Sequence, residues 1–421
     1  MATEPTPVPG GPEGRDASSP ASCCCPATYI GLMLYAITCS FSISAAQISL
    51  GIAFFGFLYD WRRGRVGPRP SPLETPFACF ALAGLLSIGN AVEPLRAIIE
   101  MNKFLIILVF WMAFWPRITP DRHRHVLAAM VFCGAASSVI GVLKLIYFDT
   151  GVFRTYGFFS LPITFGEIQT MLALTALGWL TTEEPSRPLR LGMLLSFFFL
   201  GIGILTSFTR GAWLGFLVGF IILLVRHFRR LFPIALVLGI GVIASMGISS
   251  GIHSRLESFT LENNFFRLRI WQIGFDILET NPVFGVGMNN VKPLYKDRVR
   301  SFDIQHNEVH GHLHNTFMQV LVMTGFFGFT CFCWFLARVF LWIRGEYGRR
   351  APTWAESMAG TMLPLLAAFL TMGLTEYNFG DEEVAMLFFF LLGFLGNQGS
   401  RGSGDEANGV AAGNTMPTAA S

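Results

Sequence analysis

The sequence predicts an all-α polytopic membrane protein with about 12 transmembrane helices and one large, partly helical periplasmic loop. Three observations support this fold class. The 421 residues are 52% hydrophobic and only 14% charged, whereas soluble domains carry roughly 25% charged residues. Apolar stretches of about 20 residues, the length of a spanning helix, recur along the chain. Basic residues concentrate in alternate connections between these stretches, which is typical of membrane proteins with a fixed orientation.

The predicted spans follow one another with mostly short connections. They cover 27–43, 45–60, 75–90, 98–116, 125–147, 165–181, 190–206, 211–227, 231–249, 315–343, 355–375 and 384–397. The spans divide the chain into five segments. These are a disordered cytoplasmic tail (1–26), transmembrane helices 1–9 (27–249), a periplasmic loop domain (250–313), transmembrane helices 10–12 (314–397) and a second disordered cytoplasmic tail (398–421).

The distribution of arginine predicts the orientation. Arginines are frequent in the connections that share a side with the N-terminus, namely 61–72, 116–125, 182–190, 226–230 and 344–350. Short connections on the other side contain few basic residues. We therefore expect both termini in the cytoplasm and the long loop in the periplasm. The net charge of +3 is too small to indicate nucleic-acid binding.

A helix is predicted from residue 265 to about residue 279 within the long loop. Arg269 lies on its solvated face, whereas Arg267 lies on the apolar stripe, which consists of Leu268, Trp271, Phe275 and Leu278. An arginine directed at apolar surface is costly unless it meets an anion or a carboxylate. Arg267 is therefore a candidate anion ligand, and the alternative is that it snorkels or pairs with an acid of the loop.

Four histidines, His306, His310, His312 and His314, cluster where the loop ends. Their spacing could suggest a metal site, but no cysteine lies in the loop and the acids beside the histidines are few (Asp303 and Glu308), which argues against it. His314 stands where the loop enters the next span. A neutral imidazole at this place can act as a general base, although an interfacial histidine with a purely structural role is the commoner case.

Arg210 begins a predicted span on the same outer side. Helix N-termini carry partial positive charge and unpaired N–H groups, so Arg210 and this terminus together can hold a phosphate at headgroup depth. The alternative is an interfacial anchor beside Trp213. Arg154, in another outer connection, is a weaker candidate of the same kind.

Several of these residues resemble the motifs of a known family, the bacterial O-antigen ligases, within the superfamily of O-antigen polymerases and protein O-oligosaccharyltransferases. His314-Asn315, nine residues, Gly325, two residues and Gly328 are similar to the ligase motif H-[NSQ]-x9-G-x-x-[GTY]. The segments Arg267-Leu268-x-x-Trp271 to Gly285-Val286-Gly287 and Ser207-x-x-Arg210-Gly211 resemble the loop signature and the earlier arginine motif of the superfamily. The similarity covers roughly residues 75 to 395.

The resemblance implies a glycosyltransferase in the inner membrane of a Gram-negative bacterium, with its active site facing the periplasm. The implied donor is an O-antigen polysaccharide on undecaprenyl diphosphate, and the acceptor is a sugar hydroxyl of lipid A-core. We expect His314 to be the general base and Arg210 and Arg267 to bind the diphosphate. His312 and Asn315 are expected to orient His314. No metal and no cofactor is expected.

Two alternatives remain open from the sequence. A polymerase or protein O-oligosaccharyltransferase would share the donor and the chemistry and differ in the acceptor. A transporter of a lipid-linked glycan would place charged groups near mid-membrane depth, where this chain has few, with Glu167 a partial exception.

Overall fold

The computed structural model describes residues 26–64, 69–116, 118–147, 154–182, 186–237, 261–299, 311–347 and 354–413. These ranges contain α-helices and short 3-10 helices and no strand. The chain is thus an all-helical polytopic membrane protein, as predicted. The expected N-terminal tail lies almost wholly outside the described residues, as do parts of the long loop.

The helices follow the predicted order of spans. They are α1 (Pro26–Thr38), α2 (Ile43–Arg62), α3 (Glu74–Ser87), α4 (Pro94–Glu100), α5 (Ile106–Phe114), α6 (Pro120–Tyr147), α7 (Pro162–Leu180), α8 (Arg187–Thr206), α9 (Arg210–Arg226), α12 (Leu261–Thr280), α13 (Val291–Val299), α14 (Thr316–Tyr347), α15 (Trp354–Ala359), α16 (Met362–Gly373) and α17 (Glu382–Gly413). A further helix occupies 228–237, at the start of the predicted span 231–249.

Six helical stretches among the described residues are long and apolar enough to cross a bilayer. They are Ile43–Arg62, Pro94–Phe114, Pro120–Tyr147, Pro162–Leu180, Arg187–Thr206 and Thr316–Gly345. The shorter apolar helices include α1 and α16. The predicted span 355–375 consists of two helices, α15 and α16, and α17 continues as a helix to Gly413, past the predicted start of the C-terminal tail.

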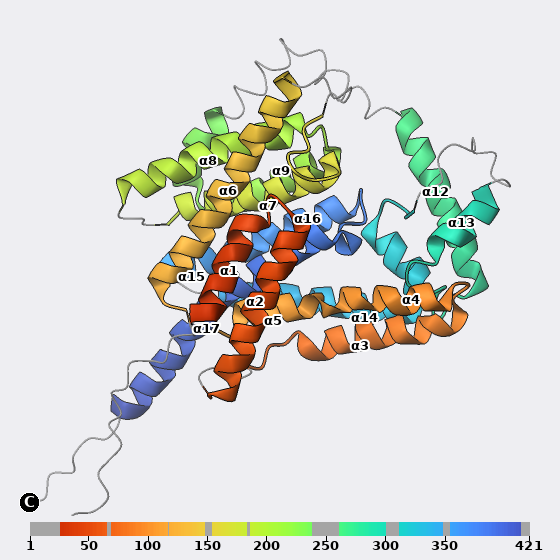
Figure 1. The fold of residues 1–421 in the computed structure, drawn as a ribbon, viewed down its shortest axis with the longest axis horizontal. Coiled ribbons are helices and arrows are strands. Elements are labelled where there is room, and N and C mark those ends of the chain that lie inside the picture. The colour runs from red at the N-terminus through yellow and green to blue at the C-terminus, as the bar shows by residue number, and fades with distance from the viewer. Residues whose placement is uncertain are drawn as a thin grey trace, which may run out of the picture.

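Helix α7 lies at the centre of the molecule, where almost all of its residues are buried. It packs against α6, α8, α9 and α16, while α14 packs along α3 and α17 packs along α5 (Figure 1). Helices α12 and α13 stand together at one end of the molecule, beside α4. We call this end the loop end, because the connections 88–105, 154–161, 207–209, 281–290 and 374–381 meet the long loop or one another there.

Helix α14 is broken at Gly325, which has a φ of 65° and a ψ of −173°. In an unbroken helix the N–H groups of Phe326 and Phe327 would donate to the carbonyls of Val322 and Met323. Instead they donate to Pro282 O (2.9 Å) and Val283 O (3.1 Å) of the connection after α12. The two helix carbonyls released in this way accept from the N–H groups of Val286 (3.1 Å) and Gly287 (3.0 Å).

The connection 281–287 is therefore inserted into the backbone hydrogen bonding of α14. Glycine is required on both sides, because a Cβ at Gly285 would lie 2.5 Å from Gly325 N and from Met323 O. A Cβ at Gly325 would in turn overlap the carbonyl of Val283. Gly325 is nine residues into α14 from Thr316, about 14 Å along the axis. A broken helix at such depth is tolerated only where neighbouring protein satisfies its backbone groups.

Asparagines attach the same connection to the segment that precedes α5. Asn90 Nδ2 donates to Gly285 O (3.2 Å), and Asn289 Nδ2 donates to Glu100 Oε1 (2.7 Å). Asn290 Oδ1 accepts from the N–H of Glu93 (2.6 Å). The connection is thus held to two membrane-embedded elements, and α12 is held with it.

Candidate functional site

His314, Glu376 and Arg267 form one polar cluster at the loop end. His314 Nδ1 lies 2.8 Å from Glu376 Oε2, and Arg267 Nη2 lies 3.5 Å from Glu376 Oε1. The Glu376 side chain is 12% exposed and those of His314 and Arg267 are 20% and 25% exposed, so the cluster is shielded but open to a ligand. An imidazole that donates from Nδ1 to a carboxylate is held in the tautomer whose basic nitrogen is Nε2. In that tautomer Nε2 is the nitrogen of His314 that can accept a proton.

The backbone of His314 is held in an unfavourable conformation. Its φ is +49°, in the left-handed region that non-glycine residues rarely adopt. The preceding residue is tied on both sides, since the N–H of Leu313 donates to Gln319 Oε1 (2.8 Å) and its carbonyl accepts from Trp271 Nε1 (3.2 Å). Such strain persists only when its surroundings fix it, and it is concentrated at functional sites.

Asn315 and Thr316 join the start of α14 to the connection that carries Glu376. Asn315 Oδ1 accepts from the N–H of Met318 (3.0 Å), which makes it the N-cap of α14. Its Nδ2 donates to Leu374 O (3.0 Å), and Thr316 Oγ1 donates to Glu376 O (3.1 Å). Asn315 thus joins the start of α14 to the connection that carries Glu376, and the orienting role expected of it stays a prediction.

His312 lies beside the pair, with its ring centroid 4.4 Å from that of His314. Tyr377 lies on its other side, 6.3 Å away. Burial and the carboxylate of Glu100 raise the pKa of Tyr377, so its hydroxyl stays protonated. His312, His314 and Glu376 each have a ligand atom within 4.8 Å of the others, a set that could hold a metal ion. Metal binding through His314 Nδ1 would break the bond to Glu376, so the two arrangements exclude each other.

Helix α12 carries Arg267 and begins at Leu261, earlier than the predicted residue 265. The predicted apolar stripe is wrong in part. Leu268 and Phe275 are exposed, whereas Leu278 is buried, as predicted; Ile270, Ile273 and Ile277 are buried as well. The pattern i, i+3, i+7 of these isoleucines defines a face that is rotated from the predicted one. Arg269 is exposed, as predicted. Arg267 is half-buried one turn before Ile270, and it meets the carboxylate that its position requires.

Arg210 is the first residue of α9 and is half-buried. The next residue, Gly211, lies against Thr375, because a Cβ there would overlap Thr375 Oγ1. Thr375 precedes Glu376 in the chain. The structure therefore brings the start of α9 to the connection that carries the His314 partner, although Arg210 and His314 are more than a hundred residues apart.

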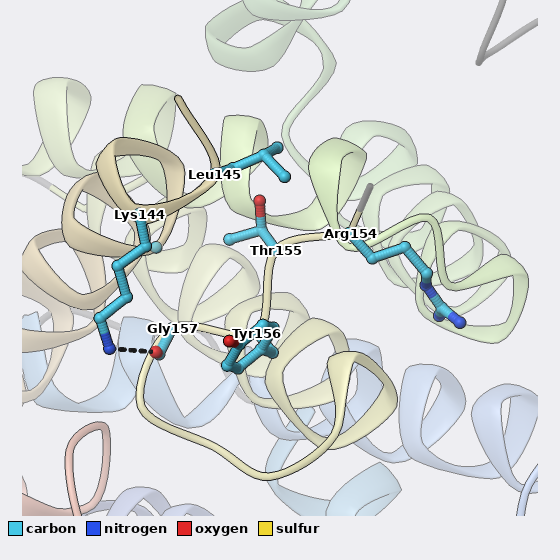
Figure 2. Close-up of a pocket in the computed structure, with 7 residues that line it drawn as sticks. Lys144, Leu145, Arg154, Thr155, Tyr156 and Gly157 are labelled. Atoms are coloured by element: carbon cyan, nitrogen blue, oxygen red, sulfur yellow. Dashed lines mark hydrogen bonds between the residues drawn. The ribbon is translucent and has the colours of Figure 1, made fainter. Parts of the chain in front are cut away.

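Arg154 contacts the turn 207–209, which directly precedes α9. Its Nε donates to Ser207 O (2.9 Å) and its Nη2 donates to Thr209 Oγ1 (3.1 Å). It also lines a small pocket with Lys144, Tyr156 and Gly157 (Figure 2). These contacts attach the guanidinium to the turn before Arg210.

Glu167 lies in the second turn of α7 and is buried. Its electrostatic neighbours are Asp381 and Glu376, so it belongs to the loop end. Asp381 accepts from Thr164 Oγ1 (2.6 Å) and is held near the start of α7.

Sequence reasoning did not single out Glu376. It attended to basic residues in the outer connections, and 376–383 contains none. A usable signal was present, because Glu376, Asp381, Glu382 and Glu383 crowd a short connection on the same predicted side as His314. Carboxylates on that side could have been considered as partners for the histidine and the arginines.

Comparison with known proteins identifies the segment that contains most of this site. Residues 195–333 match the family model described as O-antigen ligase. This part of the chain is therefore similar to the O-antigen ligases. The matched O-antigen ligase segment contains Arg210, Arg267, His312, His314 and Asn315, and it ends before Glu376. The comparison with curated proteins finds no match.

Proposed function

We propose that the protein transfers an O-antigen polysaccharide from undecaprenyl diphosphate to a sugar hydroxyl of lipid A-core, at the periplasmic face of the inner membrane. The observation that carries the proposal is the His314–Glu376 pair beside Arg267, within a chain that is similar in part to the O-antigen ligases. The pair offers a base, and the arginine offers a fixed positive charge at the same place.

His314 is the general base of the proposed reaction. The acceptor oxygen attacks the anomeric carbon of the donor while the proton of the acceptor hydroxyl passes to His314 Nε2. The imidazolium that forms is stabilised by Glu376 Oε2, 2.8 Å from Nδ1. The carboxylate thus has the role that the buried aspartate has in a serine protease triad: it fixes the tautomer and stabilises the cation.

The arginines act on the leaving group. As the bond between the sugar carbon and the diphosphate oxygen breaks, both electrons stay with the diphosphate and its negative charge increases. Fixed cations at this place stabilise the transition state more than the ground state. Arginine suits the role because its charge is constant and its planar group contacts phosphate oxygens in pairs. The Arg267–Glu376 distance of 3.5 Å is long for an ion pair, which leaves Arg267 free to turn toward an anion.

The acceptor decides between ligase and the related activities. Purified protein is incubated with lipid-linked O-antigen and, in separate reactions, with lipid A-core, with a second lipid-linked glycan or with an acceptor protein. Transfer to lipid A-core alone is expected. Chain extension of the lipid-linked glycan would identify a polymerase, and transfer to protein would identify an O-oligosaccharyltransferase.

The same assay tests the base and the metal independence. His314→Ala is expected to abolish transfer while the protein still accumulates in the membrane, and full transfer by this variant would reject the base. Transfer by the parent protein is expected to survive EDTA. Loss of transfer that added metal restores would instead favour metal binding by His312, His314 and Glu376.

A further inference from the structure

The contacts of Arg154 point to a role different from that of a diphosphate ligand. We infer that Arg154 is a positioning residue that holds the turn 207–209, and through this turn fixes Arg210 for its contact with the donor diphosphate. The inference rests on the proposed function, because it deepens the role given there to Arg210. It is carried by three observations on the described residues.

First, Arg154 contacts both ends of the turn. Its Nε donates to Ser207 O (2.9 Å) and its Nη2 donates to Thr209 Oγ1 (3.1 Å), so two N–H groups of one rigid plane span the residue between them. Thr209 Oγ1 also lies 3.1 Å from Pro162 O, at the start of α7. The hydroxyl therefore connects the turn to the central helix while it accepts from the arginine.

Second, the turn is strained. Phe208 has a φ of +48°, in the left-handed region that is unfavourable for a bulky residue. A strained turn needs contacts that hold it, and the arginine supplies two of them. Without these contacts Phe208 can relax to a negative φ, which changes the direction in which the chain enters α9 at Arg210.

Third, a backbone hydrogen bond from the residue after Arg154 to the end of α8 supports the same turn. The N–H of Thr155 donates to Thr206 O (2.9 Å), so the chain at 154–155 runs against the end of α8. Lys144, the other cation near this pocket, donates to Gly157 O (2.9 Å), and Arg154 is directed away from it (Figure 2). Arg154 is thus the cation of this pocket that reaches the turn, and Lys144 is a matched control.

A double-mutant cycle tests the inference. The rate constant kcat/KM for the lipid-linked donor is measured for the parent protein, Arg154→Ala, Arg210→Ala and the double variant. If Arg154 acts through Arg210, its loss should reduce kcat/KM on the order of 10- to 100-fold in the parent, the effect of a small misplacement of a catalytic group. In the Arg210→Ala background, Arg154→Ala should lower kcat/KM by less than about twofold.

Two further variants separate positioning from charge and from folding. Arg154→Lys keeps the charge but cannot reach both ends of the turn, so it should show most of the loss while still accumulating in the membrane. Lys144→Gln can still donate to Gly157 O and should transfer at about the parent rate.

The outcomes that would overturn the inference are distinct from failure of the proposed function. Equal losses from Arg154→Ala in both backgrounds, or full activity of Arg154→Lys, would mean that Arg154 acts independently of Arg210. Parent activity of Arg210→Ala would reject the role of Arg210 itself and the inference with it. Transfer by the parent protein, measured in the same series, reports on the proposed function.

Discussion

At the scale of residues, Glu376 links the two chemical parts of the site. One of its oxygens contacts His314 and the other approaches Arg267. A single carboxylate can therefore respond to both events of the transfer, because protonation of His314 strengthens one contact and binding of an anion by Arg267 weakens the other. The substitutions below separate these two contacts.

Replacing Glu376 with Gln should lower kcat by about 10²-fold or more, the usual contribution of a general base. The amide keeps the shape of the side chain but can no longer stabilise the imidazolium, and it can present an N–H to Nδ1 and favour the wrong tautomer. Initial rates of transfer by purified protein measure the effect. Glu279→Gln, an exposed acid on α12, is the matched control and should transfer at the parent rate. Comparable losses in the two variants would contradict the pairing.

Replacing Arg267 with Ala should reduce kcat/KM for the donor by about 10²-fold, as for loss of one donor to a developing oxyanion. Arg269→Ala, two residues away on the exposed face of α12, should stay within about twofold of the parent. Equal and mild effects of both substitutions would reject the role of Arg267. Donor titrations of both variants at fixed acceptor concentration provide the comparison.

At the scale of elements, the site consists of two pairs of residues, here called its two arms, and each pair is held together by a different kind of helix contact. Arg267 and His314 lie on α12 and at the start of α14, and these helices are joined by the inserted connection 281–287. Arg210 and Glu376 lie at the start of α9 and after α16, and these helices pack along each other. The site is closed by the contacts of Glu376 between the two arms.

Replacing Gly285 or Gly325 with Ala should destabilise the protein. A Cβ at Gly285 would overlap the backbone of α14, and a Cβ at Gly325 would overlap the backbone of the connection 281–287. Both glycines also have a positive φ, which costs any other residue about 1–2 kcal/mol. The temperature of unfolding in detergent and the amount of folded protein should both fall. Gly201→Ala on α8, where an added Cβ meets nothing within 4 Å, should leave both unchanged or raised. Normal stability of the Gly325→Ala protein would contradict the insertion.

At the scale of the whole molecule, the separation of charge predicts the orientation of the site. The arginine-rich connections lie at 61–72, 182–190 and 226–230, and the site lies at the loop end. From this separation the positive-inside rule predicts that the loop end lies in the periplasm.

Cysteine labelling tests this orientation in whole cells. A membrane-impermeant maleimide should label Glu279→Cys, on the exposed face of α12, without permeabilisation. Arg190→Cys, in a predicted cytoplasmic connection, should be labelled only after the membrane is opened. The parent protein, with its eight native cysteines, gives the background. The reverse pattern would place the site in the cytoplasm.

Much of this architecture could be predicted from the sequence, because hydropathy and arginine placement act locally along the chain. The predicted spans correspond to helices wherever the structure describes them, and His314 was placed correctly at the start of a span. The Glu376 contact could not be predicted, since it joins residues 62 positions apart through tertiary packing. The isoleucine face of α12 was missed because Leu268 and Phe275 are equally apolar, and only the neighbouring helix decides which stripe is buried.

The insertion at Gly325 also constrains how the protein is made. In the folded protein, the carbonyls of Val322 and Met323 and the N–H groups of Phe326 and Phe327 have their partners in the connection 281–287 and not within α14. Each such group left unsatisfied in hydrocarbon costs several kcal/mol. Residues 281–287 are synthesised earlier, and in the orientation predicted by the positive-inside rule they cross the membrane before they supply these partners. We therefore predict that α14 reaches its broken conformation only after the long loop has been translocated, and that a block in export of the loop leaves α14 without the connection 281–287.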